Sequence, residues 1–499
     1  MSLTAGTVPL RTGLSVALEP LPAPAGLVAQ VSDALESAGI QYCQWKGHGK
    51  RERWSAGLGD LDLLVDRTAA SRFGIALERL GFKLAIPAAD LQVPGVISYL
   101  GLDAGLGRLV HVHAHFHLVI GPAWRRHYHL PIETAILNAS VTRAPFRTPS
   151  PEHELLLFVL HQVLRHDLRS ALRSGEPVWL RQIEPELHRL ESTADPRRVA
   201  VELRRLLPDV SHRLFLRCLE SLRPGCPAPT RIAARGALEW RLRTYLRRPP
   251  LASLAARAVR PMLRAGLRNG WRWLPGKHLA AGGSVIALVG ADGAGKSTCA
   301  TSLVQWLGAE LQTRRVHLGR PPRRLLTYLT GGALKLTRRY DERRRRAEPS
   351  PLVHHLELAR HVCTARDRYL LYRRVRRFAA QGGLAICERY PIPESHALAG
   401  PSAAQGLATA AQSRLAGWLR EVETTYYARI GTPDLLVVLQ IDPDAAVARK
   451  TDEPADYVLA RARLLWDVDW SNASARVVDA GRPLEEVVAE LRFHLWENL

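Results

Sequence analysis

The sequence has few cysteines and no long apolar run, and each shortage excludes a class of protein. Its six cysteines show neither CxxC spacing nor clustering with histidines. This argues against a zinc site and a disulfide framework, and it fits a reducing cytosol. No run approaches about 18 uncharged apolar residues, and the amino terminus has no continuous apolar core. We therefore expect a cytoplasmic protein without a membrane-spanning helix or a signal peptide.

Lysine is also scarce, although the chain is strongly basic. Only seven of the 69 basic residues are lysine, and the formal net charge is +22. Such a charge can indicate a phosphate-rich partner, such as nucleic acid, a nucleotide or an anionic membrane surface. The alternative, which we favour, is a codon bias toward arginine, alanine, leucine and glycine. Charge alone therefore does not identify a partner.

The 499-residue chain is too long for one compact core and divides into four regions. Residues 25–147 mix short strand-like and helical runs, which predicts an α+β domain. Residues 148–248 have a helical pattern that begins at Ser150-Pro151-Glu152, a typical helix start. A basic linker, 249–283, is expected to pack between domains rather than on a membrane. The last region, 284–499, carries the clearest functional signal.

That signal is a glycine-rich loop between a predicted strand and a predicted helix. The strand, 284–289, is a continuous apolar run, as expected when both faces of a parallel sheet are covered. The loop that follows fits the Walker A pattern and is expected to bind ATP through backbone N–H groups and a helix start. Lys296 would reach the β- and γ-phosphates, and the Ser297 hydroxyl would complete the Mg²⁺ shell. The expected ATP-binding residues are Gly290, Ala291, Asp292, Gly293, Ala294, Gly295, Lys296, Ser297 and Thr298.

Two later segments supply further charged candidates. A second buried strand ends in Glu388, which can hold magnesium directly or through water, and in Arg389, whose donors can grip a phosphoryl group. A third strand, 433–442, precedes a helix with Arg449 and Lys450. Mobile basic residues in that position suit a lid that closes over the transferring phosphate.

Residues 284–499 resemble the thymidylate kinase family of nucleoside-monophosphate kinases. The matching pieces are GADGAGKST, the ERY at 388–390, PDLLVVLQIDPDAAVARK and the closing VVDAGRPLEEVVAEL. The resemblance implies a P-loop α/β fold, a parallel sheet flanked by helices, that moves the ATP γ-phosphate to a nucleoside monophosphate or similar acceptor. It further implies that Lys296 and Arg389 stabilise the transferring group, that Glu388 supports magnesium, and that Arg449 or Lys450 acts from the lid.

This sequence departs from the family in three places. Family members usually have aspartate where Glu388 stands, no acceptor-phosphate motif is recognisable in 317–324, and the arginine-rich run 338–346 has no counterpart. Arg320, Arg323 and Arg324 are candidates for binding the acceptor phosphate, but a solvated basic surface explains them equally well. For 338–346 a solvated helix face is favoured.

The amino-terminal region contains a second candidate site. Asp60 and Asp62 lie in a predicted strand and share one face, because strand side chains alternate. Two such carboxylates can hold a divalent metal with a nucleotide triphosphate. The pattern resembles the nucleotidyltransferase superfamily related to DNA polymerase beta, which implies a third carboxylate on a later strand. The strand expected there, 109–118, has instead alternating histidines on one predicted face: His111, His113, His115 and His117.

These histidines have two interpretations. They could ligate a metal softer than magnesium, or they could line a cleft that holds no metal, which is the interpretation we favour. For the whole chain, an ATP-dependent kinase is the first hypothesis. The alternatives are a nucleotidyltransferase with a supporting P-loop domain and a non-catalytic ATP-binding switch. The sequence indicates neither the acceptor nor the oligomeric state.

Overall fold

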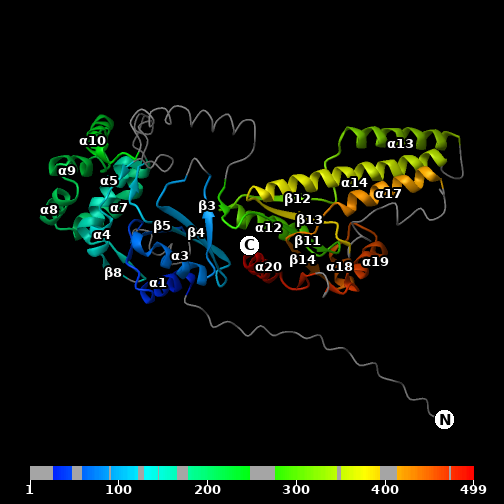
Figure 1. Ribbon diagram of the computed structural model, residues 1–499, viewed down its shortest axis with the longest axis horizontal. Coiled ribbons are helices and arrows are strands. Elements are labelled where there is room, and N and C mark those ends of the chain that lie inside the picture. Colours follow the sequence, from blue (N-terminus) through cyan, green and yellow to red (C-terminus); the bar gives the residue numbers. More distant parts are fainter. Residues whose placement is uncertain are drawn as a thin grey trace, which may run out of the picture.

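The computed structural model contains two large sheets, each with its own helices (Figure 1). The structure describes residues 26–47, 59–88, 92–121, 128–143, 145–165, 178–247, 276–344, 350–393, 413–470 and 474–499. Most of the predicted basic linker 249–283 lies outside these ranges. The expected fold class is confirmed: a parallel sheet flanked by helices follows an α+β region and a helical region.

The first sheet has six strands in the order β1-β2-β5-β4-β3-β10. Its strands are β1 (Tyr42–Gln44), β2 (Asp60–Val65), β3 (Lys83–Ile86), β4 (Val96–Asp103), β5 (Arg108–His115) and β10 (His278–Leu279). β2 and β5 are parallel, whereas the other neighbouring pairs are antiparallel. The α+β architecture of this region follows from these pairings.

Alternation along β5 gives the first sheet two different faces. Val110, Val112 and Ala114 are buried against a core that includes residues of α1 (Leu27–Ser37) and α3 (Ala70–Arg79). The histidines between them point to the opposite face, because successive strand side chains alternate. Short elements complete this region: η2 (Arg67–Ala69), β6 (Val119–Ile120), β7 (Tyr128–His129), α4 (Glu133–Asn138), β8 (Val141–Arg143) and β9 (Phe146–Thr148).

The middle region is helical, and its helices start where the sequence provides capping groups. The Asp195 side chain accepts from Arg197 N, and the Ser211 side chain accepts from Leu214 N; such contacts satisfy N–H groups that have no partner within the helix. The predicted helix start at Pro151 is confirmed. The helices are α5 (Pro151–Arg165), α7 (Val178–Thr193), α8 (Pro196–Leu206), α9 (His212–Glu220), α10 (Ala228–Arg241) and the short η3 (Leu242–Tyr245).

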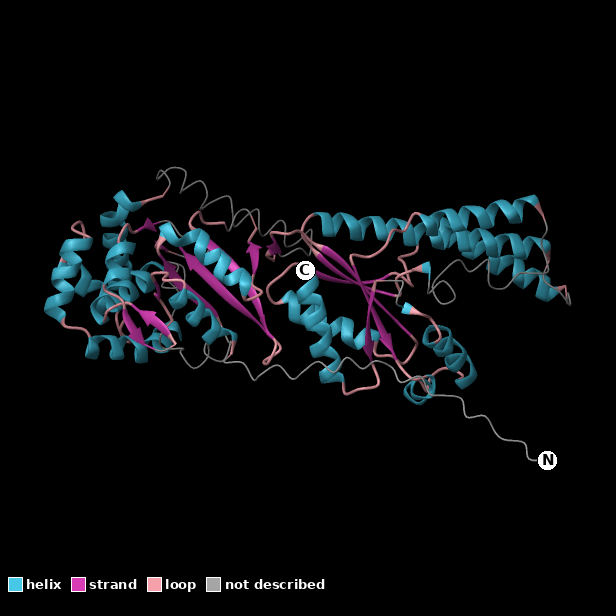
Figure 2. Cartoon of the chain, turned by 60° about the horizontal axis from the view of Figure 1, so that its bottom comes forward, coloured by secondary structure: helices cyan, strands magenta, loops and turns pink. Residues whose placement is uncertain are grey.

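The second sheet is fully parallel, in the order β12-β13-β11-β14-β15. Its strands are β11 (Ser284–Gly290), β12 (Thr313–His317), β13 (Leu384–Glu388), β14 (Leu435–Gln440) and β15 (Ala475–Asp479). The central strand β11 is buried from Val285 to Val289, as its continuous apolar run predicts. Helices α12 (Lys296–Gly308), α18 (Pro443–Arg449), α19 (Ala455–Trp466) and α20 (Leu484–Asn498) accompany this sheet. Figure 2 shows the two groups of strands apart from each other.

Three long helices form an arm that extends beyond the second sheet: α13 (Leu325–Arg343), α14 (Pro351–Ala380) and α17 (Arg414–Ala428) (Figure 1). The arginine-rich run 338–346, for which a solvated helix face was predicted, begins on α13, and its last two residues lie outside the described chain. Within it, Arg338 forms an ion pair with Glu357 of α14. Part of this run therefore contacts the neighbouring helix rather than facing only solvent.

The two sheets are joined by packing as well as by the chain. Leu279 of β10 and Leu100 of β4 belong to the same apolar cluster as the strands of the second sheet. Trp496 of α20 donates from Nε1 to Gly81 O at 3.0 Å, and Arg492 donates to Gly107 O at 2.9 Å. A membrane-spanning helix is not found in the described part of the chain, because no helix there is both long and apolar enough.

Candidate functional site

The glycine-rich loop joins the end of β11 to the start of α12, as the sequence predicts. Gly293 and Gly295 have positive φ angles of 90° and 76°, a conformation that side-chain-bearing residues rarely adopt. A Cβ on Gly290 would lie 2.6 Å from Leu439 O, so no larger residue fits there. Gly295 is the N-cap of α12, and no side chain caps this helix start. The first N–H groups of a helix have no partner within it, so this uncapped helix start is suited to stabilise an anion.

Lys296 lies at the start of α12 and is only 8 % exposed. Its Nζ donates to Ala291 O at 2.6 Å and lies 3.8 Å from Asp292 Oδ1. Burial disfavours the charged form and lowers the pKa of Lys296 to about 8. The ammonium group is thus held inside the loop by a neutral carbonyl and one nearby carboxylate.

Ser297 and Glu388, which the sequence assigns to magnesium, are in contact. Ser297 Oγ donates to Glu388 Oε2 at 2.7 Å, and Arg315 pairs with Glu388 Oε1. Burial by itself would raise the pKa of Glu388, but Arg315 and Ser297 outweigh it, so the pKa lies below its usual range. A hydroxyl and an ionised carboxylate are the oxygen ligands that Mg²⁺ prefers, so these residues fit a magnesium ion. Arg315 was not foreseen, because it comes from β12 and belongs to no motif.

Arg389 also reaches the loop, through Asp292. Arg389 Nη2 donates to Asp292 Oδ1 at 2.6 Å, and Arg461 Nε donates to Asp292 Oδ2 at 3.1 Å. Arg389 has a positive φ of 52°, a strained conformation that is commonest at functional sites. Although burial would raise the pKa of Asp292, the cations Lys296, Arg389 and Arg461 lower it. Arg461 is a site residue that the sequence interpretation missed, and no local pattern on α19 marks it.

Arg449 and Lys450, the predicted lid residues, have contacts elsewhere in this structure. Arg449 donates to Ala480 O and Gly481 O at 2.8 and 3.2 Å, and Lys450 pairs with Asp452 at 2.6 Å. The helix that carries Arg449, α18, does pack on the loop, since a Cβ on Gly293 would lie 2.8 Å from Ala446 O. The lid role of the two residues stays a prediction.

The candidate acceptor residues lie after β12. This turn approaches Arg389, because a Cβ on Gly319 would lie 2.8 Å from Arg389 Cδ. Buried Arg368 of α14 donates to Leu318 O at 2.9 Å and holds the turn in place. Arg320 follows directly, whereas Arg323 borders a hollow of about 560 Å³ along α13. Arg324 uses its backbone N–H to contact Asp367 of α14 at 3.0 Å.

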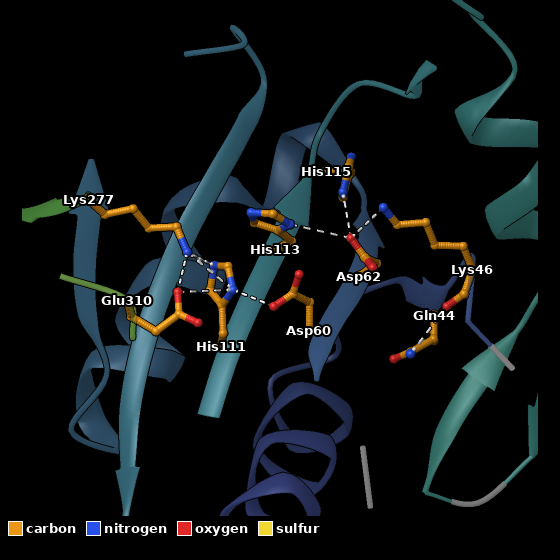
Figure 3. Close-up of polar contacts among 9 residues, drawn as sticks. All are labelled: Gln44, Lys46, Asp60, Asp62, His111, His113, His115, Lys277 and Glu310. Carbon is orange, nitrogen blue, oxygen red and sulfur yellow. Dashed lines mark hydrogen bonds and ion pairs between the residues drawn. The ribbon is translucent and has the colours of Figure 1, made fainter. Parts of the chain in front are cut away.

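The second candidate site lies on the first sheet, where β2 faces β5. Asp60 pairs in register with His111, and Asp62 with His113. His111 Nδ1 lies 2.7 Å from Asp60 Oδ1, while Asp62 Oδ1 has His113 Nδ1 at 3.5 Å and His115 Nε2 at 3.3 Å (Figure 3). The expected shared face of Asp60 and Asp62 is present, and histidines stand opposite both.

His117 departs from the expected alternation. β5 ends at His115, so the chain has left the strand before His117 and the period of two no longer applies. His117 Nδ1 lies 3.1 Å from His129 Nε2, which in turn lies 2.8 Å from Glu133 Oε1. The prediction that four histidines share one strand face is therefore wrong for this residue.

Two lysines complete the cluster on the first sheet. Lys46 Nζ lies 2.9 Å from Asp62 Oδ1, and Lys277 Nζ lies 2.6 Å from Glu310 Oε2 and 3.1 Å from His111 Nε2. Burial would raise the pKa of Asp62, but Lys46 and the neighbouring histidines hold it well below its usual range. Glu310, just beyond α12 of the second sheet, was not foreseen because only the tertiary fold brings it here.

The fold and the first site define a P-loop α/β protein, with a phosphate-binding loop at the carboxyl edge of a parallel sheet. No protein-family model matches the chain. It is 28% identical over 222 residues to YghR of Escherichia coli K12, an uncharacterized ATP-binding protein, covering 41% of this chain and 84% of the relative. It is 29% identical over 220 residues to YghS, another uncharacterized ATP-binding protein of E. coli K12, and this match covers 42% of this chain and 91% of YghS.

Among solved structures, the chain is similar to thymidylate kinase from Candida albicans. The identity is 19%, and the match covers 43% of this chain and 90% of that one, with a TM-score of 0.28.

Proposed function

We propose that this protein is an ATP-dependent phosphotransferase of the P-loop type. It transfers the γ-phosphate of ATP to a nucleoside monophosphate or a similar phosphorylated small molecule. The observation that carries the proposal is the convergence of Lys296, Ser297, Glu388 and Arg389 around one glycine-rich loop. The names of YghR and YghS as ATP-binding proteins support ATP as the donor, and their aligned lengths are close to that of region 284–499.

The residues around the loop have separable tasks in this proposal. Backbone N–H groups at the start of α12 bind the phosphates, and the Lys296 ammonium neutralises charge on the β- and γ-oxygens. Arg389 and Arg461 pair with Asp292 of the loop in this structure and would exchange that carboxylate for a phosphoryl group when ATP binds. Most of the rate would come from positioning and charge neutralisation.

Magnesium would be held by the Ser297 hydroxyl and by Glu388, directly or through water. When bound, Mg²⁺ would offset the negative charge of the phosphates. Arg315 pairs with the same carboxylate in this structure. Its Nη1 also donates to Thr301 Oγ1 at 2.9 Å, a contact that would keep the guanidinium anchored if it released Glu388.

The acceptor would enter from the side of the turn after β12. That turn lies against Arg389 and is fixed by Arg368, so Arg320 is the acceptor candidate best placed to contribute a cation near the transferring group. Arg320 suits this role because a phosphorylated acceptor brings negative charge, which a guanidinium group can pair with.

The test is ATP consumption with a panel of nucleoside monophosphates. Lys296→Ala should abolish turnover, while Lys335→Ala, an exposed lysine on α13, should leave it unchanged. The double variant Asp60→Ala/Asp62→Ala should also retain turnover. Loss of activity in the aspartate variant together with an active Lys296→Ala would move the chemistry to the first sheet and overturn the proposal.

A further inference from the structure

Three donor atoms on the first sheet converge around Asp62. They are Asp62 Oδ1, His113 Nδ1 and His115 Nε2, and all lie within 4.8 Å of one another. Two come from β5 and one from the adjacent parallel strand β2, so a regular backbone fixes their spacing. None is a cysteine, so the cysteine pattern of the chain has no bearing on this site.

Two of the three separations match the spacing of ligands in a tetrahedral metal site. Asp62 Oδ1 forms a hydrogen bond with His115 Nε2 at 3.3 Å and lies 3.5 Å from His113 Nδ1, and both distances exceed the usual hydrogen-bond range of about 2.7–3.2 Å. Ligands at about 2.0–2.1 Å from a tetrahedral ion are about 3.3–3.4 Å apart. Adjacent ligands of an octahedral Mg²⁺ are closer, at about 2.9 Å.

Burial and charge also suit a metal. The side chain of His115 is 1% exposed, that of Asp62 11% and that of His113 16%. Burial disfavours the charged form of His113 and lowers its pKa. Lys46, whose side chain is 26% exposed, approaches Asp62 from the side opposite His113 (Figure 3), so its displacement would free that side for a fourth ligand.

We propose that Asp62, His113 and His115 form a site for a first-row divalent metal ion of the Zn²⁺ class, with a fourth position open to water or substrate. Two imidazoles and one carboxylate favour such ions over magnesium. This differs from the paired-carboxylate magnesium site implied by the nucleotidyltransferase resemblance, because Asp60 is engaged by His111 at 2.7 Å. The site is independent of the proposed phosphotransfer.

Lys46 would compete with the metal ion for the Asp62 carboxylate. Its ammonium group lies 2.9 Å from the same Asp62 oxygen that would bind the ion. The two cations cannot both be closest partners of that atom, so metal binding displaces Lys46. Removing the ammonium group should therefore strengthen metal binding rather than weaken it.

The experiment uses the tag-free full chain and titrates it with Zn²⁺ by calorimetry and with Co²⁺ by visible absorption. We expect one ion per chain, intense four-coordinate Co²⁺ bands, and no displacement by millimolar Mg²⁺. His113→Ala should weaken Zn²⁺ binding by at least about 100-fold. The matched control is His129→Ala, which removes a ligand from a second cluster, that of His117, His129 and Glu133, and should leave the affinity unchanged.

Lys46→Met separates the proposal from an effect of misfolding, because a misfolded variant would not gain affinity for the metal. It retains all three ligands and should bind Zn²⁺ more tightly than the wild type, with a larger metal-induced rise in Tm. The proposal is overturned if the wild type binds neither ion, if His129→Ala removes binding while His113→Ala does not, or if Lys46→Met weakens it.

Discussion

At the scale of single residues, lysine marks the charged sites of this protein. Arginine supplies nearly all of its positive charge, yet three of the seven lysines stand at the two sites: Lys46, Lys277 and Lys296. An ammonium group is a compact charge whose pKa responds to burial, whereas a guanidinium stays charged. A buried lysine can therefore be neutralised where an arginine cannot.

This difference predicts how ATP binding depends on pH. The pKa of Lys296 is lowered to about 8 by burial, so the group is charged below that pH and becomes neutral above it. Phosphate binding needs the charge, and the affinity for ATP should therefore fall as pH rises, by up to about tenfold per unit above pH 8. Nucleotide binding measured by calorimetry from pH 7 to pH 10 checks this.

Lys296→Arg is the control for that titration. The guanidinium remains charged over the whole range, so binding by this variant should be weaker overall but level with pH. A wild-type affinity that stays constant to pH 10 would contradict the assignment.

At the scale of elements, the arm depends on contacts between its helices. The N-cap position of α13 is Arg324, and no side-chain cap comes from that residue. Instead Asp367 of α14 accepts from Arg324 N at 3.0 Å and from Thr327 Oγ1 at 2.6 Å. One buried carboxylate thus fixes both the start of α13 and its position on α14.

Asp367→Ala should accordingly lower the free energy of unfolding by about 1–3 kcal/mol, because two donors lose their acceptor. Thr330→Ala is the comparison: its hydroxyl bonds only to carbonyls of its own helix, and its effect should stay within about 0.5 kcal/mol. Urea denaturation measures the free energy of unfolding of both variants. Equal losses of stability would mean that the Asp367 cap contributes nothing.

At the scale of the whole molecule, the two sheets are packed as one unit. Trp496 is 5 % exposed, lies in the core of the second sheet and donates to Gly81 O beside the first. Glu310, which follows the P-loop helix, contacts Lys277 and lies 4.0 Å from His111. The phosphate-binding loop and the histidine cluster are thereby linked through one helix.

Trp496→Ala should lower the free energy of unfolding by about 3–5 kcal/mol, because a buried aromatic side chain leaves a cavity at the junction. Trp418→Ala removes the same side chain from α17, where it is 57% exposed, and should have little effect. Denaturant unfolding followed by circular dichroism compares the two. The packing role is contradicted if the variants are equally stable.

Much of the fold and part of each site could be predicted from the sequence. The Walker A loop, its flanking strand and helix, and the shared face of Asp60 and Asp62 depend on neighbours along the chain, so local pattern determined them. Ser297 and Glu388 were each assigned to magnesium, the first by the Walker A pattern and the second by its strand end and the thymidylate kinase resemblance, but their direct contact was not predicted. The parallel sheet followed from the buried apolar run.

Only the tertiary structure decided which distant side chains complete the sites. Arg315, Arg461 and Glu310 are brought in by strand order and helix packing, and no motif marks them. The end of β5 at His115, which turns His117 away, depends on how far pairing with β2 and β4 extends. Such contacts join residues far apart in sequence, and backbone periodicity contains no information about them.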